Sequence, residues 1–270
     1  SVLIVGAGWL GLPLATTLSE AGVSVHVTKR STSSLTQNHF RSHQLYLDDN
    51  GDMTCSDADT CFQPNTLIIT LPFKRTFEDP YSYVRQLTSL VNTYCEVNPD
   101  KKNIIFTSST SVYGSCSGIV TEDTVIECTS QRQQALYDAE QFLLRHPDVN
   151  ATILRCGGLF GYDRRIGNFS KNRLVKNAAS PVNLIHRDDV IGIICALLQR
   201  PLENTIYNLA CNHHPSKREL YTYHSEQGPS SEVRFDAETT EIMLKCVDGT
   251  KICKALGYAY IYPNLMQAYK

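Results

Sequence analysis

Six residues near the start of the chain have the types and spacing that could hold a phosphate group. They follow directly after the apolar run 2–5 and are Gly6, Ala7, Gly8, Trp9, Leu10 and Gly11. The first glycine allows a tight turn, the second lets the backbone approach a pyrophosphate, and the third lets a helix pack closely on a strand. Trp9 and Leu10 would lie at an open helix N-terminus, where N–H groups and the helix dipole attract anions. The pattern predicts a dinucleotide-binding turn.

The elements around this turn follow the order that such a unit requires. Residues 11–22 have helix-like composition, and the apolar run 23–27 indicates a second strand. A strand, the glycine turn, a helix and a second strand form the context in which the motif carries meaning.

The residues directly after the second predicted strand decide which nucleotide fits. In NAD-binding proteins an acidic side chain at this place holds the ribose 2′-hydroxyl. Here the chain has Lys29, Arg30 and Ser31, whose two cations and hydroxyl would attract a 2′-phosphate. We therefore expect NADP as the cofactor, with NAD as the alternative. In the other interpretation, Lys29 and Arg30 are only solvated charges on a loop.

Further candidate residues for binding cofactor and substrate lie where apolar runs of the sequence end. Such runs at 45–47, 65–71 and 103–107 predict buried strands. Ligands bind at the carboxyl ends of parallel strands in open α/β sheets. The residues assigned to the cofactor on this ground are Asp48, Leu71, Pro72, Thr107 and Ser108. Phe73, the next residue after the second run, is assigned to the substrate.

The rest of the chain continues the alternation of strands and helices. Helices are predicted at 79–97, 128–146 and 188–199, and strands at 151–154, 182–185 and 205–209. We therefore expect an α/β protein with a doubly wound, mostly parallel sheet of the Rossmann type. Residues 1–160 are expected to form the dinucleotide-binding core. Residues 161–270 are expected to complete the sheet, at about 182–209, and to form a small substrate-side lobe.

Composition excludes several classes of protein. Of the 270 residues, 42% are hydrophobic and 19% charged, as in ordinary globular proteins. A net charge of −2 gives no reason to expect nucleic acid or an anionic membrane as a partner. The longest apolar stretch, 190–198, is too short to span a bilayer, and no signal-like segment precedes the first strand. A cytoplasmic location is therefore expected.

The cysteines do not indicate a metal site. The chain has ten, and none forms a C-x-x-C pair. Cys211, His213 and His214 are the nearest approach to a ligand cluster, and a loop with incidental ligands is the preferred interpretation. No metal is predicted.

Four segments together resemble the extended short-chain dehydrogenase/reductases, which include nucleotide-sugar epimerases and dehydratases. They are the glycine turn 6–11, the SSxxVYG-type run 108–114, the LRxGxxxG-type run 155–161, and the run 183–190. The closing stretch 251–262 is similar to the family's LGY…YP ending. The resemblance implies a Rossmann fold, bound NAD(P), a nucleotide-sugar type of substrate, and a homodimer through the helices predicted at 79–97 and 128–146.

The resemblance assigns one hydroxyl a catalytic role. Ser109 matches the family's active-site Ser/Thr. The family's 4,6-dehydratases continue with Asp and Glu, where this chain has Thr110 and Ser111, so that reaction is not expected.

The family's Tyr-x-x-x-Lys pair is broken in this chain. In the family a Glu commonly follows the Tyr by eight positions. Counting back from Glu140 places Arg132 at the Tyr position and Leu136 at the Lys position. Shifting the register to use Tyr137 as the Tyr puts Gln141 where the Lys should be. The chain therefore resembles an atypical member.

Other residues must then supply the chemistry. Tyr113 is a candidate catalytic group, with packing of its loop as the alternative. His186 is assigned to the substrate, with a structural histidine at a strand end as the alternative. Arg132 cannot act as a base, but it could bind a phosphate or carboxylate, and Arg164 and Arg165 are placed to meet an anionic substrate.

Two functions from different classes follow from these residues. The first is an NADP-dependent oxidoreductase or epimerase acting on a nucleotide sugar or a related anionic metabolite, with a non-standard active site. The second is a catalytically inactive NADP-binding sensor or regulatory protein. Both need the same cofactor site.

Overall fold

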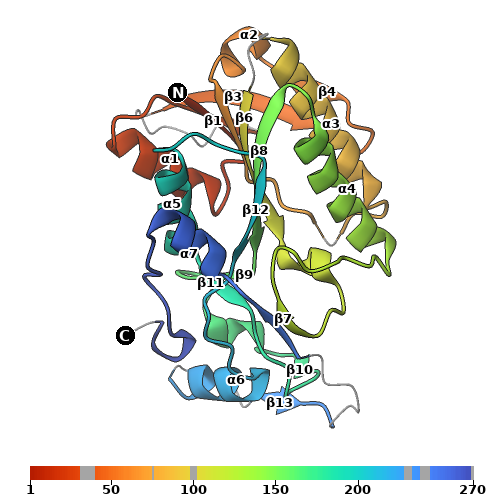
Figure 1. The fold of residues 1–270 in the computed structure, drawn as a ribbon, viewed down its shortest axis with the longest axis vertical. Coiled ribbons are helices and arrows are strands. Elements are labelled where there is room, and N and C mark those ends of the chain that lie inside the picture. The colour runs from red at the N-terminus through yellow and green to blue at the C-terminus, as the bar shows by residue number, and fades with distance from the viewer. Residues whose placement is uncertain (31–39, 75, 98–101, 228–232, 238–243, 269–270) are drawn as a thin grey trace. The chain divides into compact units, whose positions relative to one another are not determined.

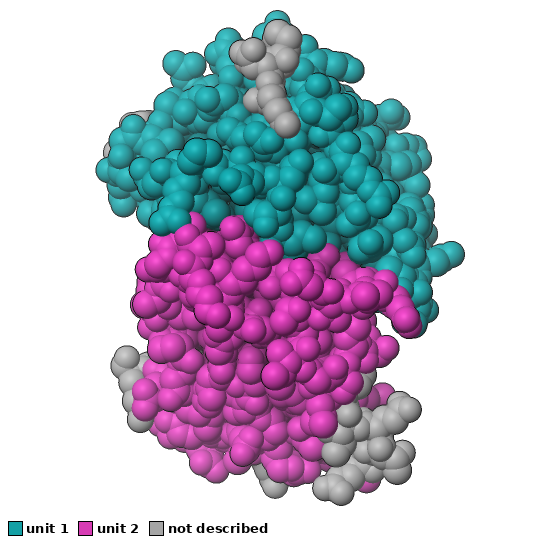
Figure 2. Space-filling view, viewed as in Figure 1, with its two compact units in different colours: residues 1–108, 128–154, 194–206 teal, residues 109–127, 155–193, 207–270 magenta. Residues whose placement is uncertain are grey.

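The computed structural model describes residues 1–30, 40–74, 76–97, 102–227, 233–237 and 244–268. The chain divides into two compact units, which Figure 2 distinguishes by colour. Unit 1 comprises residues 1–108, 128–154 and 194–206, and unit 2 comprises residues 109–127, 155–193 and 207–270. The expected division of the chain after residue 160 stays a prediction.

The central element is an eight-stranded sheet with the order β12-β8-β6-β5-β1-β2-β3-β4. Its strands are β1 (Val2–Val5), β2 (Val25–Lys29), β3 (Arg41–Leu47), β4 (Met53–Cys55), β5 (Thr66–Ile69), β6 (Lys102–Ser109), β8 (Val149–Cys156) and β12 (Thr205–Leu209). β1 pairs in parallel with β2 and β5, and β3 pairs antiparallel with β4. The chain order reverses at β1, the switch point where such sheets bind ligands. The predicted Rossmann-type α/β fold is confirmed.

The helices of unit 1 cover both faces of the sheet. They are α1 (Gly11–Glu20), α2 (Ala58–Cys61), α3 (Tyr81–Glu96) and α4 (Gln131–Arg145). In Figure 1, α1 lies on one side of the strands, and α3 and α4 lie on the other. The apolar stripe of α3 is buried because its spacing matches the helical period, and it joins one core with strand residues such as Leu3, Leu67 and Ile104.

Two histidines lie hydrogen-bonded inside unit 1. His26 of β2 and His43 of β3 are 4% and 5% exposed, and the His43 Nε2 lies 3.1 Å from the His26 Nδ1. Asp57 lies 3.8 Å from the other nitrogen of His43. Burial is the main cause that lowers the pKa of both histidines, with neighbouring Arg41 acting in the same direction.

This pair predicts an acid-sensitive fold. The unfolded chain protonates both histidines below about pH 6.5, whereas the folded protein takes up these protons only at lower pH. The stabilisation is therefore fully present above pH 6.5 and is lost as the pH falls from there toward the lowered values. We expect the urea midpoint to drop between pH 7.5 and pH 5.5. A His26→Phe/His43→Leu variant should show a smaller drop, and an equal drop would contradict the assignment.

The described residues of unit 2 form three short parallel strand pairs. They are β7 (Gly118–Val120) with β14 (Lys245–Val247), β9 (Gly158–Phe160) with β11 (Leu184–His186), and β10 (Leu174–Val175) with β13 (Arg234–Phe235). Its further elements are the 3-10 turns η1 (Thr110–Tyr113), η2 (Ile166–Phe169) and η3 (Leu265–Gln267), and the helices α6 (Lys217–Glu226) and α7 (Thr250–Leu256). The helix α5 (Arg187–Leu197) begins in unit 2. A core cluster around Phe160, Val182 and Leu220 fills this unit.

Several predicted boundaries need correction, among them that of the strand expected at 151–154, which spans Val149–Cys156, and that of the helix expected at 128–146, which spans Gln131–Arg145. The second strand spans Val25–Lys29 rather than 23–27, so Lys29 is its last residue rather than a loop residue. The third strand begins at Arg41, well before residue 45, because polar residues alternate with its buried ones. The strand expected at 182–185 is Leu184–His186. In the described part of the chain, the helices are all too short or too polar to cross a membrane.

Candidate functional site

The glycine turn of unit 1 has the geometry that its sequence predicts. Gly6 has φ +105°, a region that favours glycine. A Cβ on Gly11 would lie 2.3 Å from the carbonyl oxygen of Gly6, so only glycine lets α1 approach β1 this closely. A Cβ on Gly8 would meet nothing closer than 3.9 Å, and Gly8 is exposed. The turn is therefore closely packed at Gly6 and Gly11 and open at Gly8.

The N-terminus of α1 suits an anion. Its N-cap residue, Leu10, makes no side-chain cap hydrogen bond, and its first turn carries no acidic residue. The turn is anchored to the sheet because Ala7 N–H donates to the carbonyl of Thr28 at 3.1 Å. The open middle glycine, the uncapped helix and the missing acid fit the pyrophosphate of a dinucleotide.

The last residue of β2 and the residue that follows it carry positive charge. Lys29 is half-buried at the end of the strand, and Arg30 is exposed. The Gln44 side-chain amide donates to the Arg30 carbonyl at 2.9 Å, which fixes the backbone there. Ser31, the third residue of this predicted set, lies outside the described residues.

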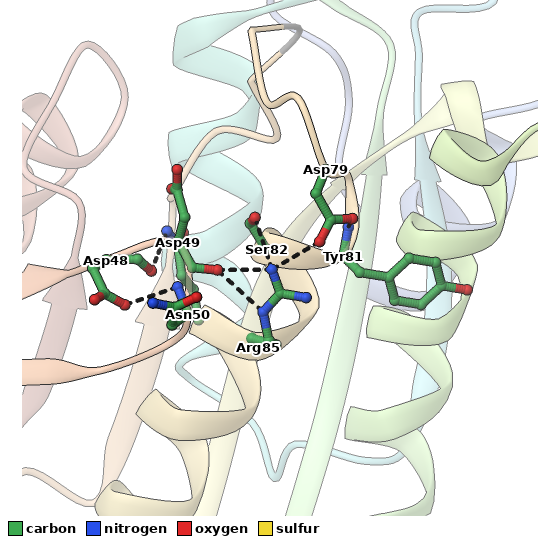
Figure 3. Close-up of polar contacts among 8 residues, drawn as sticks. Asp48, Asp49, Asn50, Asp79, Tyr81, Ser82 and Arg85 are labelled. Atoms are coloured by element: carbon green, nitrogen blue, oxygen red, sulfur yellow. Dashed lines mark hydrogen bonds and ion pairs between the residues drawn. The ribbon is translucent and has the colours of Figure 1, made fainter.

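Asp48 organises the turn that follows β3. Its Oδ1 accepts hydrogen bonds from the N–H groups of Asn50 and Asp52, both at 2.8 Å. Figure 3 shows how Arg85 of α3 holds this turn: its guanidinium donates to the Asp49 carbonyl and to the Asp79 carboxylate. The structure thus gives Asp48 a turn-forming role, and its contact with a cofactor stays a prediction.

The carboxyl ends of β5 and β6 lie beside each other in unit 1. The Thr107 hydroxyl donates to the Ile69 carbonyl at 3.0 Å. Tyr83 of α3 donates to the Leu71 carbonyl at 2.9 Å and so positions the segment that continues to Pro72. Ser108 is 7% exposed, and its hydroxyl donates to the buried Glu140 carboxylate at 2.5 Å. Ser108 is therefore engaged within the core.

Arg132 of α4 lies on the segment that follows β5. Its guanidinium carbon lies 4.0 Å from the centre of the Phe73 ring, and one N–H donates to the Phe73 carbonyl at 2.7 Å. The structure thus brings together two of the residues predicted to bind substrate. Leu136, one helical turn further, is 2% exposed. That the family's Tyr-x-x-x-Lys pair is missing at these two positions stays a prediction.

Ser109 and Tyr113 belong to unit 2. Ser109 is half-buried, and its Oγ accepts a hydrogen bond from Ser111 N–H at 3.1 Å. Tyr113 is fully buried, donates to Asn208 Oδ1 at 2.7 Å, and accepts from Arg155 at 2.9 Å. Burial raises the pKa of Tyr113, so the phenol stays protonated at neutral pH. This environment is that of a packing residue, and a catalytic role for Tyr113 stays a prediction.

His186 lies in an aromatic stack of unit 2. Its ring centre is 3.7 Å from that of Tyr262, and its Nδ1 accepts from Asp188 N–H at 3.1 Å. Burial lowers the pKa of His186, which favours the neutral ring. Arg164 and Arg165 are exposed in the turn after β9. An anion could reach both arginines, whereas His186 is 4% exposed and is held as a structural residue would be.

The two histidines of the loop 211–214 make hydrogen-bond contacts within the protein. His213 Nδ1 accepts from Leu265 N–H at 3.1 Å, and His214 Nδ1 contacts the Val182 carbonyl at 3.0 Å. Cys211 is buried. Across the described residues, no three His, Cys, Asp or Glu side chains are grouped to hold a metal ion.

Sequence reasoning missed two residues that shape these sites. Thr70 contacts the glycine turn, and its place at the end of β5 next to β1 was the available signal. Arg155 was noted only as part of a motif, although it is 1% exposed and its guanidinium lies 4.8 Å from the Tyr113 ring centre. The sequence contains no signal that shows which side chain a buried arginine will contact.

The sheet order and the glycine turn define a Rossmann-type α/β protein. The chain belongs to the NAD dependent epimerase/dehydratase family, whose model matches residues 2–210. It is 33% identical to Protein YeeZ of Escherichia coli (strain K12) over 266 residues, which cover 97% of this chain and 96% of that protein.

Two solved structures show the same fold at low identity. MoeE5 in complex with UDP-glucuronic acid and NAD is 18% identical, with a TM-score of 0.79 over 99% of this chain and 96% of its own. The UDP-glucose 4-epimerase of Thermotoga maritima with UDP-glucose is 16% identical, with a TM-score of 0.78 over 99% of this chain and 96% of its own. These comparisons agree with the resemblance to extended short-chain dehydrogenase/reductases.

Proposed function

We propose that unit 1 binds NADP at the glycine turn. The observation that carries this proposal is the shape of the turn, which is closed at Gly6 and Gly11 and open at Gly8 beside an uncapped helix. Lys29 and Arg30 favour NADP over NAD because they offer cations where NAD-binding proteins place an acid. MoeE5, which shares the fold, is described in complex with NAD, and NAD is the alternative cofactor here.

Removing the two cations tests the preference. A Lys29→Ala/Arg30→Ala variant should bind NADPH about tenfold more weakly or worse, since charge-assisted hydrogen bonds contribute about 1.5–3 kcal/mol. Its affinity for NADH should change less than threefold, because NADH has no 2′-phosphate. Fluorescence titration of both nucleotides measures this, with Lys254→Ala, an exposed lysine of α7, as the matched control. Equal losses for NADPH and NADH would contradict the preference.

We further propose that the protein is an oxidoreductase or epimerase acting on an anionic metabolite of the nucleotide-sugar class. When bound, NADP exchanges a hydride with a substrate carbon. The exposed Arg164 and Arg165 offer cations to a phosphate or carboxylate, and the guanidinium of Arg132 carries five N–H donors. The Ser109 hydroxyl is the candidate to hydrogen-bond the reacting oxygen. MoeE5, described with UDP-glucuronic acid, supports this substrate class by analogy of fold.

One observation favours the second candidate, a catalytically inactive NADP-binding sensor. Leu136, which the resemblance matches to the family's lysine, is buried. Arg132, which the resemblance matches to the tyrosine, cannot exchange a proton. An NADPH oxidation assay on a panel of nucleotide sugars and sugar phosphates separates the two candidates. Turnover that a Ser109→Ala variant loses supports the enzyme. Tight NADPH binding without turnover on any member of the panel supports the sensor.

A homodimer through α3 and α4 is part of the same proposal. The face of α4 around Gln141, Phe142 and Arg145, with His146 beside it, forms a shallow groove. Light scattering with size-exclusion chromatography measures the mass, and a monomer at micromolar concentration would contradict this point.

A further inference from the structure

A threonine outside the glycine turn holds that turn from the neighbouring strand. Thr70 directly follows β5, and its hydroxyl oxygen lies 2.7 Å from the Gly6 carbonyl oxygen and 3.3 Å from that of Val5. Its backbone N–H also donates to the Val5 carbonyl at 3.0 Å. One residue thus binds both the last residue of β1 and the first residue of the turn.

The same hydroxyl occupies the space beside the two outer glycines. A Cβ on Gly6 would lie 3.0 Å from the Thr70 Oγ1, and a Cβ on Gly11 would lie 2.8 Å from it. Glycine imposes little restraint on its own backbone, so Gly6 alone does not fix the direction of its carbonyl group. The hydrogen bond from Thr70 supplies that restraint.

The restraint continues through the backbone of the turn into the first turn of α1. The Gly6 carbonyl also accepts from Gly8 N–H at 2.7 Å, and the Gly8 carbonyl accepts from Leu12 N–H in the first turn of α1 at 3.0 Å. These bonds form a chain from Thr70 through the turn into the helix. A turn whose backbone is held in place before binding need not be ordered during binding, which favours affinity.

We propose that Thr70 is a positioning residue for the dinucleotide site, acting through the Gly6 carbonyl rather than by touching the ligand. This inference rests on the proposed binding of NADP at the turn. A hydroxyl is required at this position, and a side chain of the same shape without one does not replace it.

Three variants test the role of the hydroxyl in binding. Thr70→Val keeps the shape and removes the hydroxyl, whereas Thr70→Ser keeps the hydroxyl. Thr152→Val is the matched control, because Thr152 of β8 is 1% exposed and its hydroxyl donates to the Glu203 carbonyl at 3.1 Å. In fluorescence titrations we expect Thr70→Val to bind NADPH about tenfold more weakly, Thr70→Ser within about twofold of wild type, and Thr152→Val unchanged despite a lowered Tm.

A second measurement needs no cofactor. Amide hydrogen exchange of the peptide covering residues 6–12 should be about tenfold faster in Thr70→Val than in wild type, and unchanged in Thr152→Val. Wild-type affinity in Thr70→Val, affinity of Thr70→Ser as weak as that of Thr70→Val, or unchanged exchange would each overturn the role of Thr70. Wild-type protein that binds neither NADPH nor NADH would instead contradict the proposed function, and the exchange result would then decide the role of Thr70 in holding the turn.

Discussion

A Gly11→Ala variant is expected to lose roughly 1–3 kcal/mol of unfolding free energy, together with its dinucleotide binding. The added Cβ would lie 2.3 Å from the Gly6 carbonyl oxygen and 2.8 Å from the Thr70 hydroxyl. The first of these is a backbone atom, so α1 and β1 must separate to relieve the clash. That separation displaces the helix N-terminus on which an anion would rest. Urea denaturation and NADPH titration of the same preparation measure both effects.

Gly8→Ala provides the contrast. Its Cβ meets only one atom within 4 Å, at 3.9 Å, so the unfolding free energy should stay within about 0.5 kcal/mol of wild type. NADPH binding should still weaken by about tenfold or more, because this backbone is the part that approaches the pyrophosphate. A Gly11→Ala protein as stable as Gly8→Ala would show that the close approach of α1 and β1 is not required.

Replacing Arg155 is expected to have the largest effect on unit 2. Arg155 is 1% exposed, donates to the Tyr113 hydroxyl at 2.9 Å, and lies with its guanidinium 4.8 Å from the Tyr113 ring centre. Asn208 completes this group, since it accepts from Tyr113 and its N–H donates to Glu122. An Arg155→Met variant leaves buried polar partners without their cation, which should cost about 3 kcal/mol.

The matched control is Arg173→Met, because Arg173 is exposed. Its unfolding free energy should change by less than about 0.5 kcal/mol. Urea denaturation monitored by tyrosine fluorescence and circular dichroism measures both variants. If Arg155→Met were as stable as Arg173→Met, the buried group would not be a stabilising part of unit 2.

The long elements of the fold could be predicted from the sequence because each has a strong local pattern. The strands at 2–5 and 205–209 lie where they were expected, and the stripe Tyr83, Leu87, Leu90, Val91 and Tyr94 is buried on α3. In unit 2 the strand β11 was expected at 182–185, close to its place, whereas β7 and β14 could not be predicted in this way. β7 pairs with β14 more than a hundred residues away, and each has only three residues, too few to show a period.

Some parts of the candidate site could be predicted from the sequence, and other parts could not. The glycine turn could be predicted because its chemistry depends on residue types at fixed spacing. The surroundings of Tyr113 and His186 could not, because their burial depends on Arg155, Asn208 and Tyr262, which come from distant parts of the chain. The buried pair His26 and His43 was missed for a different reason, because polar residues in a strand usually indicate an exposed face.

The central claim is that this chain binds NADP through its glycine turn. Isothermal titration of the wild-type protein with NADPH and with NADH tests it most directly. We predict one site per chain for NADPH, with a Kd at least tenfold lower than for NADH. Absence of binding for both nucleotides would contradict the claim, and tighter binding of NADH would contradict the role assigned to Lys29 and Arg30.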